Sequence, residues 1–401
     1  MKFEMKTKAL RFLSDIQTGP FGSQLHKEDY VDDGTPIVTV EHLGNRVFTE
    51  QNLPRVSNED KQRLSKYILK EGDIVFSRVG SVDRCSFVDS QHTGWLFSGR
   101  CLRVRPFEEI SPLFLYYFFC LESTKKFMRN IAVGATMPSI NTKLMGEIEV
   151  SYPDKQVQEK IANLLGAIDD KIELNNAIND NLEQQAAALF KSWFVDYDLW
   201  DGVRPDGWTN APLGTFVEIK RGGSPRPIQD YLSDSGLRWL KISDVTSLSS
   251  PFVLEIKEHI KEEGLKKTVF LHAGELVLSN SATPGIPKIL DVDTCIHDGW
   301  LYFPKSELSK YYLYLFFKYI RKELVSLGNG SVFTNLKTDI LKAFPVSKAD
   351  KTTLKEFDAL VSPLFDAMLN ANRENLKLAT IRDSLLPKLM SGELDVSAIE
   401  L

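Results

Sequence analysis

The apolar positions between about Asp154 and Asp196 repeat at alternating steps of three and four residues. This stretch contains no Pro and a single Gly, Gly166. Such a pattern predicts one long helix that packs lengthwise against another helix. Asn175 and Asn179 occupy the apolar face, where polar residues typically fix the register of paired helices. The apolar positions are Ile161, Leu165, Ile168, Ile172, Leu182, Ala186, Leu189 and Trp193.

A second stretch, from Lys355 to about Met390, matches the first after a shift of 196 positions, which places Ile161 on Phe357 and Leu189 on Leu385. The sequence therefore contains an internal repeat with a period near half its length. We expect the two helices to form an antiparallel pair. Pro363 lies inside the second stretch and is expected to kink that helix or displace its start.

The repeat extends to the segments that precede the helices. KEGDIVFSRVGS (70–81) matches HAGELVLSNSAT (272–283), and SPLFLYYFF (111–119) matches SKYYLYLFF (309–317). Each half begins with short β-branched runs broken by Gly- and Pro-rich turns, and a short apolar helix follows at 112–128 or 310–326. The prediction is an α+β fold with two similar globular domains in a pseudo-twofold repeat. Its expected parts are a first domain at 1–150, a long helix at 151–196, a linker and second domain at 197–346, and a helix with a tail at 347–401.

Composition narrows the class of protein without identifying a cofactor. The chain has 401 residues and a formal net charge of −5, which argues against coating nucleic acid through bulk charge and leaves local basic patches open. Its four Cys form no CxxC pair, so we expect reduced thiols and no zinc. The N-terminus has no signal-peptide core, and the longest apolar run is too short to span a bilayer. The expected location is the cytoplasm.

Motifs for catalysis are missing from the sequence. No Gly-Lys dipeptide occurs, which excludes a Walker loop, and no G-x-G-x-x-G or G-x-S-x-G is present. The absence of any Pro-Pro dipeptide removes the motif of a DNA amino-methyltransferase. We therefore expect no catalytic residues, no metal ligands and no cofactor bound by this chain. Two alternative functions remain. One is a stand-alone methylase or nuclease, which the missing motifs disfavour, and the other is a non-enzymatic coiled-coil scaffold with two protein-binding heads.

Each globular half has one locally basic stretch among turn residues, at 76–105 and at 220–241. Arg side chains there suit guanine, whereas Asn and Gln suit adenine, and other contacts would go to phosphates. The candidate DNA-binding residues are Ser23, Gln24, Arg78, Arg84, Arg221, Ser224, Arg226, Lys241 and Asn280.

Taken together, the ordered duplication, the GDIVFSRVGS block (72–81), the joint at 139–176 and the ending RDSLLPKLMSGELDV (382–396) resemble the specificity subunit of type I restriction–modification systems. The resemblance covers nearly the whole chain. It implies two target recognition domains, at about 1–150 and 205–346, that read a split, asymmetric site in double-stranded DNA. It also implies two copies of an adenine methyltransferase as partners, which a restriction and translocase subunit can join. S-adenosylmethionine, ATP and Mg would then be bound by those partners. The base sequence that is read and its spacer length do not follow from the resemblance.

Overall fold

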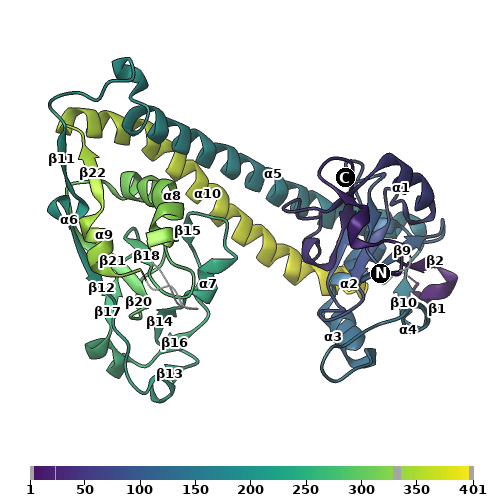
Figure 1. Ribbon diagram of the computed structural model, residues 1–401. Coiled ribbons are helices and arrows are strands. Elements are labelled where there is room, and N and C mark those ends of the chain that lie inside the picture. The colour runs from purple at the N-terminus through teal and green to yellow at the C-terminus, as the bar shows by residue number, and fades with distance from the viewer. Residues whose placement is uncertain (1–3, 23, 328–335, 397–401) are drawn as a thin grey trace. The chain divides into compact units, whose positions relative to one another are not determined.

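The structure is a computed structural model that describes residues 4–22, 24–327 and 336–396. The chain divides into two compact units, Met1–Lys171 with Leu378–Leu401, and Ile172–Lys377. Two long helices, α5 and α10, contribute residues to both units (Figure 1). We call the strand-rich part of unit 1 (residues 4–152) the first head and that of unit 2 (residues 209–348) the second head.

The long helices confirm the predicted repeat. Helix α5 spans Lys155–Phe194 and helix α10 spans Lys351–Met390, 40 residues each, so both ends keep the shift of 196 positions. Each helix begins after an aspartate that accepts hydrogen bonds from its first turn. Asp154 accepts from the Val157 amide (3.1 Å), and Asp350 accepts from the Thr353 amide (3.1 Å). These caps satisfy amides that have no partner inside a helix.

Pro363 neither interrupts α10 nor marks its start, contrary to the expectation from sequence. The residue is exposed, whereas Val361 and Phe365 on the packed face are fully buried. The carbonyl that loses a donor at Pro363 therefore belongs to the exposed side of the helix. Nearby, the Ser362 hydroxyl donates to the Asp358 carbonyl (2.6 Å).

Within each unit the two helices pair antiparallel. In unit 2, Phe357 near the start of α10 packs on Phe194 at the end of α5, with ring centroids 4.8 Å apart. In unit 1, Arg382 near the end of α10 donates to Asp169 in the first half of α5 (2.7 Å). The predicted apolar face is buried at half of its positions, Ile161, Leu165, Ala186 and Trp193, and half-buried at Ile168, Ile172, Leu182 and Leu189.

The first head contains two four-stranded sheets, in the orders β2-β9-β6-β7 and β3-β5-β4-β8, and a separate pair, β1-β10. Its strands are β1 (Lys6–Ala9), β2 (Ser14–Thr18), β3 (Tyr30–Val31), β4 (Thr35–Val38), β5 (Arg55–Val56), β6 (Ile74–Ser77), β7 (Cys85–Phe87), β8 (Leu96–Phe97), β9 (Cys101–Pro106) and β10 (Glu149–Tyr152), and its helices are α1 (Asn58–Arg63), α2 (Pro112–Cys120), α3 (Glu122–Ile131) and α4 (Thr142–Gly146).

The second head repeats this topology and adds one edge strand to each sheet, giving β12-β21-β18-β19-β15, β13-β16-β14-β20-β17 and the pair β11-β22. Its strands are β11 (Thr209–Pro212), β12 (Val217–Arg221), β13 (Leu232–Ser233), β14 (Leu237–Leu240), β15 (Phe252–Val253), β16 (His259–Ile260), β17 (Val269–Leu271), β18 (Leu276–Ser279), β19 (Pro287–Leu290), β20 (Thr294–Ile296), β21 (Trp300–Ser306) and β22 (Pro345–Lys348), and its helices are α6 (Leu213–Phe216), α7 (Ser243–Thr246), α8 (Lys310–Leu327) and α9 (Thr338–Ala343).

The short apolar helix of each head packs against the long helices and belongs to the core. Tyr117 on α2 donates to Asp169 on α5 (2.7 Å), and Tyr314 on α8 donates to Glu183 on α5. The sequence predicted one helix at 112–128, but the structure has two, α2 and α3, which meet at Leu121. These aromatic residues are buried in the clusters that hold each head to its helices, so base stacking is excluded for them.

Candidate nucleic-acid interface

Four loops of the first head converge on an open hollow of about 480 Å³, which we call the first groove. The loops follow strands β2, β4, β6 and β8, so strand ends position them. The groove is lined by Pro20, Phe21, Gly22, Leu25, Tyr30, Thr39, Val40, Glu41, Arg78, Ser98, Gly99 and Arg100.

The corresponding loops of the second head, after β12, β14, β18 and β20, form a second groove of about 830 Å³. Its floor is more apolar because it includes Trp239 and Ile242. It is lined by Ser224, Pro225, Arg226, Pro227, Ile228, Leu232, Trp239, Lys241, Ile242, Ser243, Glu258, Ser281, Ala282 and His297.

Backbone hydrogen bonds show that the two grooves are equivalent in the repeat. In the first, the Arg78 amide donates to the Arg100 carbonyl and the Arg78 carbonyl accepts from Ile140, at 2.8 and 3.0 Å. In the second, the Asn280 amide donates to Gly299 and its carbonyl accepts from Leu336, both at 2.8 Å. The same frame therefore presents Arg78 in one head and Asn280 in the other.

A glycine at the start of each groove is required by close backbone packing. A Cβ on Gly19 would lie 2.1 Å from the Ser98 carbonyl oxygen, and one on Gly222 would lie 2.2 Å from that of His297. No side chain fits at such distances, so both loops leave their strands in the same direction. The repeat thus preserves the loop frame while the lining side chains differ.

The predicted residues of the first head separate into those in the groove and those outside it. Arg78 lines the groove, with its guanidinium 5.5 Å from the centre of the Phe21 ring. The Gln24 side-chain oxygen accepts from the Tyr67 hydroxyl (2.6 Å), which holds that amide beside the groove. Arg84 does not line the groove and donates to the Leu43 carbonyl. Ser23 lies outside the described residues.

In the second head, Asp298 gathers three of the predicted residues. Its carboxylate accepts from the Ser224 hydroxyl at 2.6 Å and pairs with Arg226 at 3.2 Å, and its carbonyl accepts from Arg221 at 2.7 Å. The Ser224 hydrogen bond is the main cause that lowers the pKa of Asp298 below its ordinary value. An ionised carboxylate therefore orders the β12–β13 loop at the edge of the second groove.

The remaining predicted residues lie at or beneath the second groove. Lys241 lines it and pairs with Glu258. Asn280 is fully buried, and among the described residues neither polar atom of its side chain has a hydrogen-bond partner. His297 also lines the groove, and burial lowers its pKa, which favours the neutral ring near pH 7.

Two arginines of the first basic stretch are not available to a ligand, contrary to the expectation that this stretch is exposed. Arg103 on β9 is 1% exposed and pairs with Asp15. Arg105, on the same strand, pairs with the buried carboxylate of Asp73 at 2.6 Å. Both belong to a strand inside the sheet, and their charges are matched there.

Sequence reasoning did not select Phe21, Asp298, Trp239 or Glu258. Phe21 lies in a turn that the sequence identified, and Asp298 could have been found from the alignment of the loops across the repeat. Trp239 lies on strand β14, and no turn signal marked either Trp239 or Glu258. Gly99 in the first half falls on Asp298 in the second when the Gly19 and Gly222 loops are matched.

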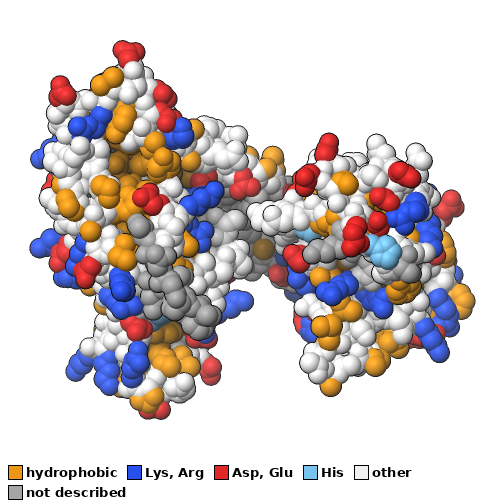
Figure 2. Space-filling model, in the orientation of Figure 1, with side chains coloured by type: hydrophobic (Ala, Val, Ile, Leu, Met, Phe, Trp, Pro, Cys, Tyr) orange, Lys and Arg blue, Asp and Glu red, His pale blue; other side chains and the backbone are white. Residues whose placement is uncertain are grey.

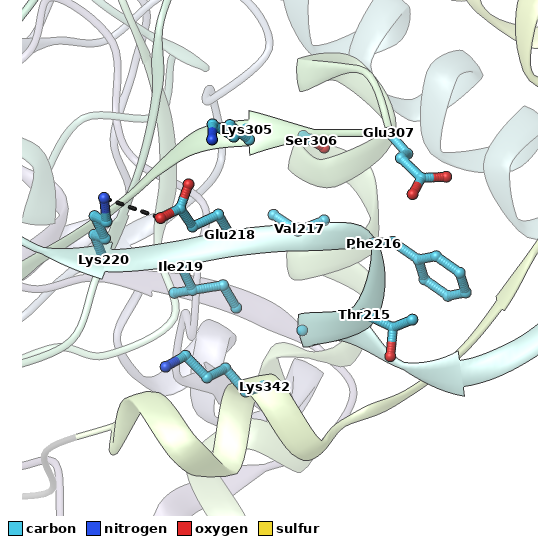
Figure 3. Close-up of a pocket in the computed structure, with 11 residues that line it drawn as sticks. Thr215, Phe216, Val217, Glu218, Ile219, Lys220, Lys305, Ser306, Glu307 and Lys342 are labelled. Atoms are coloured by element: carbon cyan, nitrogen blue, oxygen red, sulfur yellow. Dashed lines mark ion pairs between the residues drawn. The ribbon is translucent and has the colours of Figure 1, made fainter.

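A third hollow, of about 730 Å³, lies at the start of β12 in the second head. Figure 3 shows Lys220 paired with Glu218 on this strand, with Lys305 from β21 on one side and Lys342 from α9 on the other. Glu218 and Glu307 also line this hollow, so its three ammonium groups face two carboxylates and do not form a purely basic patch.

The surface charge agrees with local rather than bulk attraction of DNA. On the face shown in Figure 2, Lys and Arg side chains are interspersed with Asp and Glu in both units. Among the described residues, no group of three or more His, Cys, Asp or Glu could hold a metal ion. In the same part of the chain, no helix is long and apolar enough to cross a membrane.

The described residues form a duplicated α+β fold with one loop-lined groove in each head. The family model for the type I restriction modification DNA specificity domain matches residues 4–184 and 205–356. The chain therefore belongs to this family of type I specificity subunits.

Two relatives and one solved structure show the extent of the similarity. The MjaIX specificity subunit of Methanocaldococcus jannaschii is 25% identical, over 98% of this chain and 94% of the relative. The HindI specificity subunit of Haemophilus influenzae is 26% identical, over 84% and 90%. The crystal structure of the type I S subunit from M. genitalium superposes with a TM-score of 0.60 at 16% identity, over 97% of this chain and 96% of that one, which supports the same fold.

Proposed function

We propose that this chain recognises a bipartite, asymmetric site in double-stranded DNA and directs adenine methylation or restriction by partner subunits. The observation that carries the proposal is the pair of grooves, which share a backbone frame but differ in chemistry. One presents Arg78 beside Phe21, and the other presents Arg226 and Lys241 above Trp239. Two different grooves would read two different half-sites.

The proposed partners are two copies of an adenine methyltransferase, which a restriction and translocase subunit can join. S-adenosylmethionine, ATP and Mg would be bound by those subunits and not by this chain. The duplicated helices support a requirement for two similar partners, because each repeat carries one copy of the same helix. The chain itself would contribute recognition and no catalytic step.

Mapping of methylated adenine by single-molecule sequencing tests this proposal. Cells with and without the chain are compared, and a second strain carries residues 205–346 replaced by the same region of a relative. We expect one split motif that depends on the chain and a replacement that changes only one half. A change in both halves would contradict independent reading by the two heads.

The scaffold alternative makes a different prediction for DNA binding. Phosphate contacts release counterions, so the affinity of a DNA-binding complex falls steeply with salt. The assembled complex is therefore titrated with duplex DNA at 50 and 200 mM salt. Absence of salt-sensitive binding would favour a scaffold with protein-binding heads.

A further inference from the structure

We infer that Arg78 reads a guanine in the half-site bound by the first head. The inference rests on the proposed function and deepens it, because it assigns one base to one side chain. It is carried by the way the structure holds Arg78 in the first groove.

The backbone of Arg78 is fixed on both sides. Its amide donates to the Arg100 carbonyl (2.8 Å), and its carbonyl accepts from the Ile140 amide (3.0 Å). The next residue, Val79, forms a bridge with Ser139. The side chain therefore projects from a rigid point, although it follows directly after the end of strand β6.

Contacts within the described part of the protein position the guanidinium of Arg78 but do not occupy all of its hydrogen-bond donors. It lies over Phe21, and its Nη1 donates to the Gly99 carbonyl at 3.3 Å, near the long end for such a bond. Among the described residues, no carboxylate pairs with it, and its Nε and Nη2 have no acceptor. Arg78 is half-buried, and none of its donors is a buried atom without a partner, so the donors that lack a protein acceptor can reach a ligand in the groove.

Other arginines of the first head show what a structural role looks like here. Arg63 pairs with Asp60 and Asp29, and Arg105 pairs with Asp73. Arg129 on α3 pairs with Asp83 and Glu122. In each case a carboxylate takes up the donors that Arg78 leaves available.

The shape and polarity of the group select the base. A flat guanidinium donates two parallel hydrogen bonds, which match the O6 and N7 acceptors of guanine in the major groove of DNA. Adenine presents a donor in place of O6, so one of the two bonds is lost. Phe21 restrains the plane of the guanidinium, which reduces the side-chain freedom lost on binding.

The second head has a different residue at the position equivalent to Arg78. The equivalent position is Asn280, whose side chain is fully buried, and the arginine of that groove comes from another loop, as Arg226. The guanine contact is therefore a property of the first half-site and not of the repeat as a whole.

The test is adenine methylation mapping in cells that carry the native partners and either the wild-type chain or Arg78→Gln. The half-site of the first head is the half left unchanged when residues 205–346 are exchanged. We expect that half to contain a guanine, and Arg78→Gln to relax or change that one position. Competition between duplexes should show a loss of roughly 5- to 150-fold in discrimination there.

Arg129→Gln is the matched control, because it removes an exposed arginine of the same head that does not line the groove. It should leave the motif unchanged. An unchanged motif in Arg78→Gln would overturn the inference, as would an equal loss of affinity for duplexes with and without the guanine, which marks a phosphate contact. A first half-site without guanine would also overturn it, while absence of any motif in wild type would instead refute the proposed function.

Discussion

A polar layer in the apolar face of the helix pair should be strongly coupled. In unit 2, the Asn175 amide nitrogen donates to Asn375 at 2.9 Å and to Glu374 at 2.8 Å. The Asn375 amide nitrogen donates in turn to Asn176 at 2.8 Å. Asn175 is only 2% exposed, so water cannot easily replace a lost partner.

The magnitudes follow from these bonds. Asn375→Leu removes two neutral hydrogen bonds, at about 1 kcal/mol each, and leaves Asn175 with fewer partners, for a net loss of about 1–3 kcal/mol. Asn175→Leu should cost a similar amount, because it removes the hydrogen bonds that Asn175 donates to Asn375 and Glu374. The double variant replaces both polar groups by facing apolar ones and should be close to the wild type in stability, as such replacements often are.

Calorimetric unfolding of the full chain and its three variants measures the coupling. We expect an interaction free energy of about 2–6 kcal/mol, the sum of the two single losses, because the double variant should be close to the wild type. Asn181→Leu on the exposed face of α5 is the control and should change stability by less than about 0.5 kcal/mol. Simple additivity of the two losses would refute the reasoning, since it would mean that the two amides do not act as one layer.

Three further predictions concern the second head. Burial lowers the pKa of Lys288 from 10.5 to about 8. The stability of the wild type relative to Lys288→Met should therefore rise by about 3 kcal/mol between pH 7 and pH 10.5. Denaturation at several pH values measures this difference, and a pH-independent difference would contradict the prediction. Asp298→Asn frees Arg226 from its ion pair and removes a negative charge, so the assembled complex should bind non-specific DNA more tightly. The decrease of affinity with salt concentration should be steeper by about one phosphate contact. An unchanged salt dependence would place Arg226 away from DNA. Asn280→Leu removes two buried polar atoms that have no hydrogen-bond partner within the described part of the chain, so it should raise the free energy of unfolding by about 1–3 kcal/mol in calorimetry. A loss of stability would contradict the unpaired state.

The long helices were predictable because their signal is local and repeated. An apolar residue every three or four positions over 40 residues leaves little choice of structure, and the shift of 196 positions provides a second copy of the same evidence. Strands β6 and β18 were predictable for the same reason, since each has a β-branched run between turns. The prediction that Pro363 would displace the start of the second helix was wrong, because the cost of proline depends on which face it occupies, and that face follows from the packing.

The residues that line the two grooves were only partly predictable from the sequence. Arg78, Arg226 and Lys241 were selected by residue type and by neighbouring turns, and the structure places all three in grooves. Arg103 was grouped with them because sequence does not show which strand residue meets a carboxylate such as Asp15 across the sheet. Pairing of that kind depends on strand order, which the sequence pattern leaves open.

The two halves of the chain agree at some equivalent positions and differ at others, and this pattern shows which features the duplication preserves. Where the backbone requires a particular residue, the halves agree, as at Gly19 and Gly222. In the loops around the grooves they differ in charge as well as in size, as at Arg78 and Asn280 or Gly99 and Asp298. Selection for stability alone would not favour a fully buried amide that has no hydrogen-bond partner among the described residues, as at Asn280, because it costs free energy. Shared backbone frames with divergent loop residues are expected of two heads that each recognise a different ligand surface.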